Sequence, residues 1–139
     1  MTPPRIIVTA AVIRRAGLVF VTRRHEGVHL EGFWEFPGGK CDPDEPLERC
    51  LMREIREELD VEVRVGKELL SCAHEYPDRI VELHFFECEV AEEPRPMLGQ
   101  EMRWVPQAEL RRLQFPPADD ALIDLVTESW NASHKSRRE

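Results

Sequence analysis

The amino-acid sequence predicts an α+β fold in which a mixed set of strands packs with two main helices. Short apolar runs that end at turn residues indicate strands. One stretch repeats apolar residues every four positions, and a second amphipathic stretch lies near the carboxyl end, so each indicates a helix. The 139 residues are enough to bury one core, and we expect a single domain over residues 1–139.

Strands are expected first along the chain. Residues 5–14 are rich in Ile, Val and Ala, which is typical of a strand buried on both faces. Ala16–Gly17 favour a turn before a second strand over residues 18–22, so a hairpin is predicted. A polar loop over residues 25–32 leads to a short aromatic strand over residues 33–36, which a Pro-Gly-Gly turn ends.

The clearest helix signal covers residues 43–60. Pro46 suits the first helical position, and Asp60 can adopt the left-handed conformation that ends a helix. A buried stripe is predicted from apolar residues that recur every four positions, namely Leu47, Leu51, Ile55 and Leu59.

The second half of the chain is predicted to hold further strands over residues 61–65, 68–75 and 80–90, the last with partial alternation of apolar and polar residues. A loop that contains two prolines follows over residues 92–99. These segments supply the strands of the mixed sheet.

The carboxyl end is predicted to hold a strand over residues 102–105, a short helix over 106–113 and a final amphipathic helix. Asp119–Asp120 would cap that helix. Its apolar face would comprise Leu122, Leu125, Val126 and Trp130. The polar residues 133–139 form a tail.

The charge balance excludes some classes of partner. The chain has 27 acidic and 19 basic residues, a net charge of -8 and a pI near 5.2. Gripping a nucleic acid backbone requires clustered Lys and Arg, so no nucleic acid polymer is expected as a partner. The apolar run over residues 6–13 is far shorter than the roughly 20 residues that span a membrane, and no signal-peptide cleavage site follows it. A cytoplasmic location is therefore expected.

The four cysteines, Cys41, Cys50, Cys72 and Cys88, show neither C-x-x-C pairing nor a His at zinc-ligand spacing. No structural zinc site is expected. Scattered thiols without a signal peptide indicate a reducing compartment, in which these cysteines would serve as small apolar side chains.

Three glutamates on the main helix suggest a metal site. At about 100° per residue, Glu54, Glu57 and Glu58 lie within one sector beside the buried stripe, not opposite it. Glu54 and Glu58 are a like-charge pair that costs about 0.2–0.5 kcal/mol, so a compensating cation is expected. Mg²⁺ takes oxygen ligands and is held by carboxylates together with a substrate's phosphates.

Two plainer explanations exist for these residues. The helix can be an ordinary amphipathic helix in which Arg53 and Glu57 form an i,i+4 ion pair. The glycines Gly38–Gly39 can form a simple turn. Alternatively, their bare backbone approaches a site and supplies a carbonyl oxygen as a further metal ligand.

The spacing from Gly39 through Glu45 to the run Arg53–Val61 resembles the Nudix box, G-x5-E-x7-R-E-U-x-E-E-x-G-U, over residues 39–61. Asp60 is the one departure, because the family has Gly there. Other segments look like MutT-type nucleoside triphosphate pyrophosphohydrolases, namely residues 18–24, 34–40, 76–79 and 115–119. The resemblance implies the Nudix α/β/α sandwich around a mixed sheet.

The implied reaction is metal-dependent hydrolysis of a nucleoside triphosphate by water attack on the β-phosphorus, giving a monophosphate and pyrophosphate. The resemblance assigns Mg²⁺, or alternatively Mn²⁺, as the cofactor. Glu54, Glu57, Glu58 and the Gly38 carbonyl would be its ligands, and Glu54 would also orient or deprotonate the water. Arg53 and Glu45 would position these glutamates.

The resemblance extends to the substrate pocket. Arg23 and Lys40 would contact phosphates, and Arg23, Phe36 and Asp78 match positions that line the base pocket. A second departure is Leu98, which replaces a loop glutamate that MutT-type enzymes commonly use. Glu101 is the nearest carboxylate and is favoured as its substitute, which would make it a further metal ligand, with activity from the box glutamates alone as the alternative.

Asp119 occupies the position at which related 8-oxo-dGTP hydrolases use Asn to read the purine. An ionised Asp only accepts hydrogen bonds, which suits a cytosine amino group or guanine N–H groups. It donates to guanine O6 only when burial protonates it. Hydrolysis of 8-oxo-dGTP, which cleanses the nucleotide pool, is the leading prediction. CTP or a modified dCTP is the alternative substrate, and a plain helix cap is the alternative role for Asp119.

Two further possibilities remain at this stage. The chain can bind a nucleotide without hydrolysis, although a water-activating carboxylate argues against that. It can also cleave another diphosphate, such as a sugar nucleotide or a diadenosine polyphosphate. A monomer and a homodimer are both compatible with the sequence.

Overall fold

The computed structural model describes residues 3–27 and 31–128. Contacts divide the chain into two compact units, one of Met1–Ile13 with Phe36–Gly99 and the other of Arg14–Glu35 with Gln100–Glu139. Each unit is described by itself. The single domain over residues 1–139 stays a prediction.

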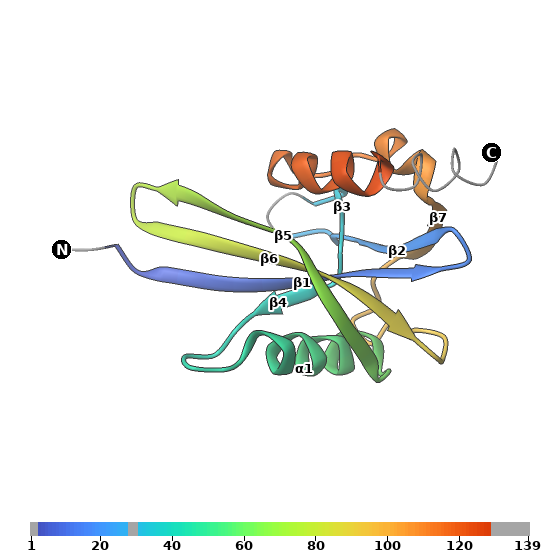
Figure 1. Cartoon of the computed structure of the whole chain (residues 1–139), viewed down its shortest axis with the longest axis horizontal. Helices are drawn as coiled ribbons and strands as arrows, with labels where there is room; N and C mark the ends of the chain where they lie inside the picture. Colours follow the sequence, from blue (N-terminus) through green and yellow to red (C-terminus); the bar gives the residue numbers. More distant parts are fainter. Residues whose placement is uncertain (1–2, 28–30, 129–139) are drawn as a thin grey trace. The chain divides into compact units, whose positions relative to one another are not determined.

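The first unit contains a mixed sheet (Figure 1). Strand β1 (Arg5–Arg15) pairs in parallel with β6 (Arg79–Val90), which pairs antiparallel with β5 (Val63–Tyr76). The short strand β4 (Gly38–Lys40) pairs antiparallel with β1. Residues 9–13 of β1 are all buried, as their apolar composition predicts.

Two strands of this unit differ from the sequence prediction. The separate strands expected over residues 61–65 and 68–75 are one strand, β5, whose register shifts on either side of Glu68. The bulges let one strand continue through Gly66, where the apolar pattern of the sequence is interrupted. An added Cβ at Gly66 would lie 3.0 Å from the Glu87 carbonyl oxygen. The expected Pro-Gly-Gly turn continues directly into β4.

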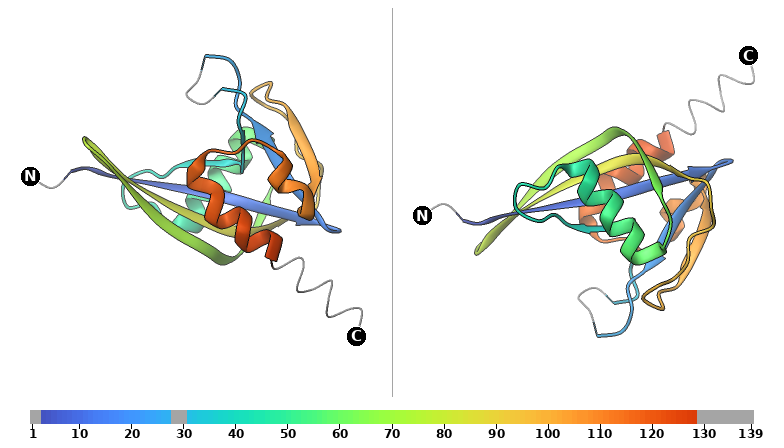
Figure 2. Two further views of the ribbon diagram at one scale, coloured as in Figure 1. Left: turned by 90° about the horizontal axis from the view of Figure 1, so that it is seen from above. Right: turned by 90° about the horizontal axis from the view of Figure 1, so that it is seen from below.

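Helix α1 spans Leu47–Leu59 and packs on β4 and β5 (Figure 2). It begins later than the predicted residue 43, because Pro46 has an extended conformation and is the N-cap residue. Its buried side chains are Cys50, Leu51, Ile55 and Leu59. Leu47 of the predicted stripe is only half-buried, and Cys50 takes the buried position at that end.

Asp60 ends α1 in the left-handed conformation, with φ 53° and ψ 39°. Its N–H donates to the Arg56 carbonyl at 3.0 Å, which is the predicted helix termination. The Asp60 carboxylate lies 3.4 Å from Arg95 in an exposed ion pair.

The second unit contains an antiparallel sheet centred on β2 (Leu18–Arg23). The end of β1 forms the predicted hairpin with β2 through Arg14 and Arg15. β3 (Trp34–Glu35) and β7 (Met102–Pro106) also pair with β2. Phe20 of β2 packs edge-on against Trp104 of β7, with ring centroids 5.1 Å apart.

Short helices complete the second unit. The helix expected over residues 106–113 is a 3-10 helix, η1 (Gln107–Arg112), and η2 (Pro117–Asp119) is a second 3-10 turn. Residues 120–128 are α-helical. Among the described residues, no helix has the length and apolar character needed to cross a membrane.

The buried face of helix 120–128 differs from the prediction. Leu122, Ile123 and Val126 are buried, whereas Leu125 is 37% exposed. At 100° per residue, the three buried side chains form one stripe and Leu125 lies about 100° from its centre. Trp130 and residues 133–139 lie outside the described residues.

Replacing Asp60 with Gly should raise the free energy of unfolding by about 1 kcal/mol, because Gly adopts the left-handed conformation without a Cβ clash. The exposed pair with Arg95 contributes at most about 1 kcal/mol and usually less. Urea denaturation measures the difference. The control Asp60→Ala keeps the Cβ and should lower the stability. A glycine variant less stable than the parent chain would contradict this role for residue 60.

Candidate functional site

Two of the three predicted carboxylates of α1, Glu54 and Glu58, lie against the strand β4. The Glu58 Oε2 atom accepts a hydrogen bond from the Gly38 N–H at 3.2 Å. The Glu54 side chain is only 15% exposed, whereas that of Glu57 is 59% exposed. The structure therefore brings Gly38 together with Glu58, and it encloses Glu54 more than Glu57.

The two glycines of β4 permit this close approach. A Cβ on Gly39 would lie within the Glu54 carboxylate, 2.9 Å from Oε1 and closer to its other atoms. A Cβ on Gly38 would lie 2.8 Å from the Ala10 Cα atom of the neighbouring strand. Side chains at these positions would displace β4 or Glu54, so glycine is a steric requirement here.

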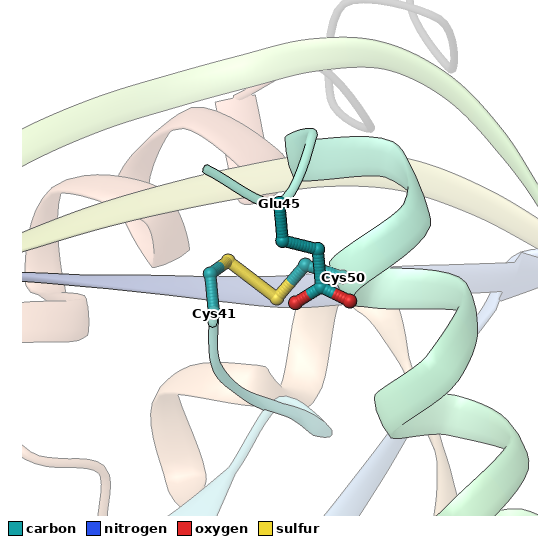
Figure 3. Close-up of side chains that lie close together, drawn as sticks. All are labelled: Cys41, Glu45 and Cys50. Atoms are coloured by element: carbon teal, nitrogen blue, oxygen red, sulfur yellow. A yellow bond between two sulfur atoms is a disulfide. The ribbon is translucent and has the colours of Figure 1, made fainter. Parts of the chain in front are cut away.

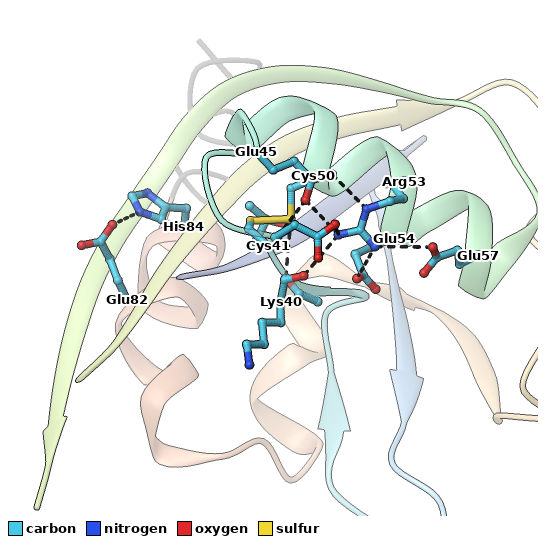
Figure 4. The surroundings of a disulfide bond; sticks show 12 residues. Lys40, Cys41, Glu45, Cys50, Arg53, Glu54, Glu57, Glu82 and His84 are labelled. Carbon is cyan, nitrogen blue, oxygen red and sulfur yellow. Dashed lines mark hydrogen bonds and ion pairs between the residues drawn. A yellow bond between two sulfur atoms is a disulfide. The ribbon is translucent and has the colours of Figure 1, made fainter. Parts of the chain in front are cut away.

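Arg53 connects the loop before α1 with the carboxylates on the helix (Figure 4). Its Nε and Nη2 atoms donate to the two Glu45 carboxylate oxygens, each at 2.9 Å. Its Nη1 atom donates to Glu54 at 2.9 Å and to Glu57 at 3.4 Å. Nη2 also donates to the Lys40 carbonyl at 3.3 Å. The Arg53 guanidinium thus donates hydrogen bonds to three of the predicted catalytic residues.

This network shifts the pKa values of its members in opposite directions. Hydrogen bonds from Arg53 and from the Asp42 N–H lower the pKa of Glu45 to about 2. The bond to Glu45 also raises the pKa of Arg53, so this pair stays charged. Burial raises the pKa of Glu54, and the Arg53 hydrogen bond offsets the rise only in part. Glu54 therefore binds a proton more readily than an exposed glutamate does.

In the second unit, Arg23 and Glu101 lie side by side. Arg23 Nη1 is 3.3 Å from Glu101 Oε1, and Arg23 Nε donates to the Gly32 carbonyl at 3.0 Å. The Arg23 guanidinium also lies over the Trp34 ring, 5.7 Å from the centroid. Arg103 is 3.7 Å from the other Glu101 oxygen. Two cations thus hold the carboxylate that we expect to substitute for the missing loop glutamate.

Asp119 of the second unit is buried, with 9% of its surface exposed. Burial raises the pKa of Asp119 to about 7, and the negative charges of Glu35 and Asp120 add to the rise. Asp119 is the last residue of the 3-10 helix η2 and directly precedes helix 120–128.

The remaining predicted substrate residues belong to the first unit. Phe36 is buried and packs edge-on against Phe85, with centroids 6.2 Å apart. Lys40 is exposed, and Asp78 is exposed in the turn between β5 and β6. Leu98 is 57% exposed.

A disulfide joins Cys41 and Cys50, and the sequence did not reveal it (Figure 3). The expectation that these two cysteines are separate apolar side chains is wrong, because the loop before α1 folds back and brings them together. Their sulfur atoms and a Glu45 oxygen lie within 4.8 Å of one another. Sulfurs bonded to each other are not thiolates, so this cluster does not offer a zinc site. Cys88 is buried with a pKa raised to about 12, which fits the predicted apolar role.

Comparisons with known proteins agree with the sequence motif. A family profile described as NUDIX domain matches residues 8–125. An 8-oxo-dGTP diphosphatase of Haemophilus influenzae is 40% identical over 130 residues, which cover 91% of this chain and 95% of that protein. A CTP pyrophosphohydrolase of Escherichia coli is 43% identical over 79 residues, covering 57% of this chain and 58% of that protein.

The fold has a close structural counterpart. The solution structure of the E. coli ORF135 protein matches with a TM-score of 0.79 and 33% identity, covering 97% of this chain and 94% of that one. The crystal structure of a MutT protein from Methanosarcina mazei also matches, with a TM-score of 0.77 and 27% identity, covering 97% of this chain and 99% of that one. The predicted α+β Nudix fold is thereby confirmed. Because the family profile spans most of the chain and the H. influenzae relative aligns over nearly its full length, the chain belongs to the NUDIX domain family.

Proposed function

We propose that this chain hydrolyses a nucleoside triphosphate to a monophosphate and pyrophosphate with a divalent cation, Mg²⁺ or Mn²⁺. The observation that carries the proposal is the packing of Glu54 and Glu58 against Gly38–Gly39, with Arg53 holding the carboxylates. An ordinary amphipathic helix would direct its glutamates to solvent, whereas Glu54 is largely enclosed. The names of the relatives support the same reaction class.

The proposed ligand atoms fit a hard divalent cation. Carboxylates of Glu54, Glu57 and Glu58 and the Gly38 carbonyl are all oxygen ligands, which Mg²⁺ and Mn²⁺ prefer. Gly39 leaves the space that the Glu54 carboxylate occupies, so this carboxylate lies beside bare backbone. Bound there, the cation would neutralise phosphate charge and make the phosphorus more electrophilic.

The protein's own groups would divide the remaining work. Glu54, whose pKa burial raises, orients the attacking water and accepts its proton. Arg53 fixes the orientation of Glu54, and Glu45 fixes Arg53 through two hydrogen bonds. Glu101 substitutes for the acid absent at Leu98.

The substrate proposed first is 8-oxo-dGTP, within a cytoplasmic nucleotide pool and not within a nucleic acid polymer. Arg23 and Lys40 contact its phosphates, and Arg23, Phe36 and Asp78 line the base pocket. With a pKa of about 7, Asp119 is partly protonated near neutral pH. The protonated acid both donates and accepts, as reading a purine edge requires. The ionised form only accepts, which favours the cytosine amino group, so CTP or a modified dCTP is the second candidate.

Turnover with Mg²⁺ should release pyrophosphate. In water labelled with oxygen-18, attack on the β-phosphorus places the label in pyrophosphate, which mass spectrometry detects. Label in the monophosphate would place the attack on the α-phosphorus instead. Orthophosphate as the primary product would contradict the proposed reaction.

Glu57→Gln should lower kcat at least about a hundredfold, because the amide removes one charged metal ligand. Steady-state kinetics measure the loss, and circular dichroism confirms the fold. Glu48→Gln is the matched control, since Glu48 lies exposed on the same helix and should leave kcat unchanged. Equal turnover of the two variants would show that Glu57 has no part in the reaction.

The preference for 8-oxo-dGTP over CTP should fall about tenfold between pH 6 and pH 8. Protonated Asp119 predominates below its pKa of about 7, and the ionised form predominates above it. Asp119→Asn should give a high preference that does not change with pH, whereas Asp120→Asn should retain the dependence. The ratio of kcat/KM for the two substrates measures the effect. A parental ratio that is flat with pH would remove Asp119 from base recognition.

A further inference from the structure

The disulfide between Cys41 and Cys50 crosses the loop that carries Glu45. Cys41 directly follows β4, and its N–H donates to the Ile7 carbonyl of β1 at 2.8 Å. Cys50 lies in the first turn of α1, where its N–H donates to the Pro46 carbonyl at 2.9 Å. The bond therefore ties the end of the glycine strand to the start of the helix that carries the carboxylates.

Arg53 contacts the same loop by hydrogen bonds, through the Lys40 carbonyl and the Glu45 side chain. Asp44, within the enclosed segment, has a φ of 62°. Aspartate tolerates this left-handed conformation better than most residues but at some cost in energy, so the surrounding loop contributes to maintaining it. The disulfide and the Arg53 hydrogen bonds thus both restrain the loop that contains Glu45 (Figure 4).

We propose that Cys41 and Cys50 form a reversible thiol–disulfide site, and that the disulfide state increases the affinity of the neighbouring carboxylate centre for a divalent cation. The identity of that centre rests on the proposed function. Reduction frees the loop, so Glu45 holds Arg53 in a smaller fraction of molecules and Glu54 loses part of its fixed orientation.

Exposure determines which sulfur reacts. Cys41 is partly exposed, whereas Cys50 is fully buried. The thiolate of a small dithiol reductant therefore attacks Cys41 Sγ, forms a mixed disulfide with it and breaks the Cys41–Cys50 bond. The electron pair of the broken bond leaves on Cys50 as a thiolate.

The second step completes the exchange. The other thiol of the reductant, as its thiolate, displaces the Cys41 thiolate and leaves as a cyclic disulfide. Both cysteine thiolates then take a proton from solvent. The Thr9 hydroxyl lies 3.3 Å from Cys50 Sγ. A small disulfide oxidant reverses the reaction.

The full-length chain should be compared after oxidation with glutathione disulfide and after reduction with dithiothreitol, each followed by removal of the reagent. Differential alkylation with peptide mass spectrometry reads the state of each cysteine. The oxidised form should protect Cys41 and Cys50 and raise Tm by about 5–10 °C. Its Kd for Mn²⁺, measured by electron paramagnetic resonance, should be three- to tenfold lower, on the order expected from restraining one loop.

Cys41→Ser should have the reduced-state Mn²⁺ affinity under both treatments. Cys72→Ser is the matched control, because Cys72 is a partly exposed cysteine that belongs neither to the disulfide nor to the loop, so this variant should retain both states. Alkylation of both Cys41 and Cys50 after oxidation would overturn the proposal. A disulfide that raises Tm but leaves the Kd unchanged would also overturn it, because the bond would then be structural only.

These readouts need no nucleotide. A chain that hydrolyses no triphosphate in either state would refute the proposed function, while alkylation and Mn²⁺ binding would still decide whether the thiol–disulfide site exists and acts on the centre.

Discussion

The candidate centre depends on the hydrogen bonds that the Arg53 guanidinium donates. It donates to Glu45 in the loop before α1 and to Glu54 on the helix, so one cation joins the two segments. Charge-assisted bonds of this bidentate kind are strong and directional. They also keep Glu45 ionised, with a pKa near 2, while burial moves the Glu54 pKa the other way. In the proposed mechanism these two glutamates have different roles, because Glu45 anchors Arg53 and Glu54 accepts the proton of the attacking water.

Local sequence patterns predicted the parts of the centre that lie on one element. The helical period placed Glu54, Glu57 and Glu58 on one side of α1, because side-chain direction follows from the turn per residue. The left-handed end at Asp60 was also predictable, since the family motif has glycine there and Asp tolerates that conformation. The role of Gly39 followed from the motif, and the clash of a Cβ with Glu54 supplies its physical reason.

Features that depend on distant segments were not predictable. Gly38 indicated a turn, yet it pairs with Ala10 of β1, a partner that only the folded chain supplies. The Cys41–Cys50 bond requires the fold of the loop between them, which the cysteine spacing does not encode. The raised pKa of Asp119 comes from burial, and burial at one position is set by the tertiary structure. The buried face of helix 120–128 differs from the predicted one for the same reason, and Leu125 is exposed.

Mn²⁺ affinity in an Arg53 variant tests this organisation most directly. Arg53→Lys keeps the positive charge but lacks the forked donors that reach Glu45 and Glu54 together. Its Kd for Mn²⁺, measured by electron paramagnetic resonance without nucleotide, should rise at least about tenfold. Arg56→Lys, on the exposed face of the same helix, should leave the Kd unchanged. Equal affinities in the two variants would contradict the role of Arg53 in organising the carboxylates.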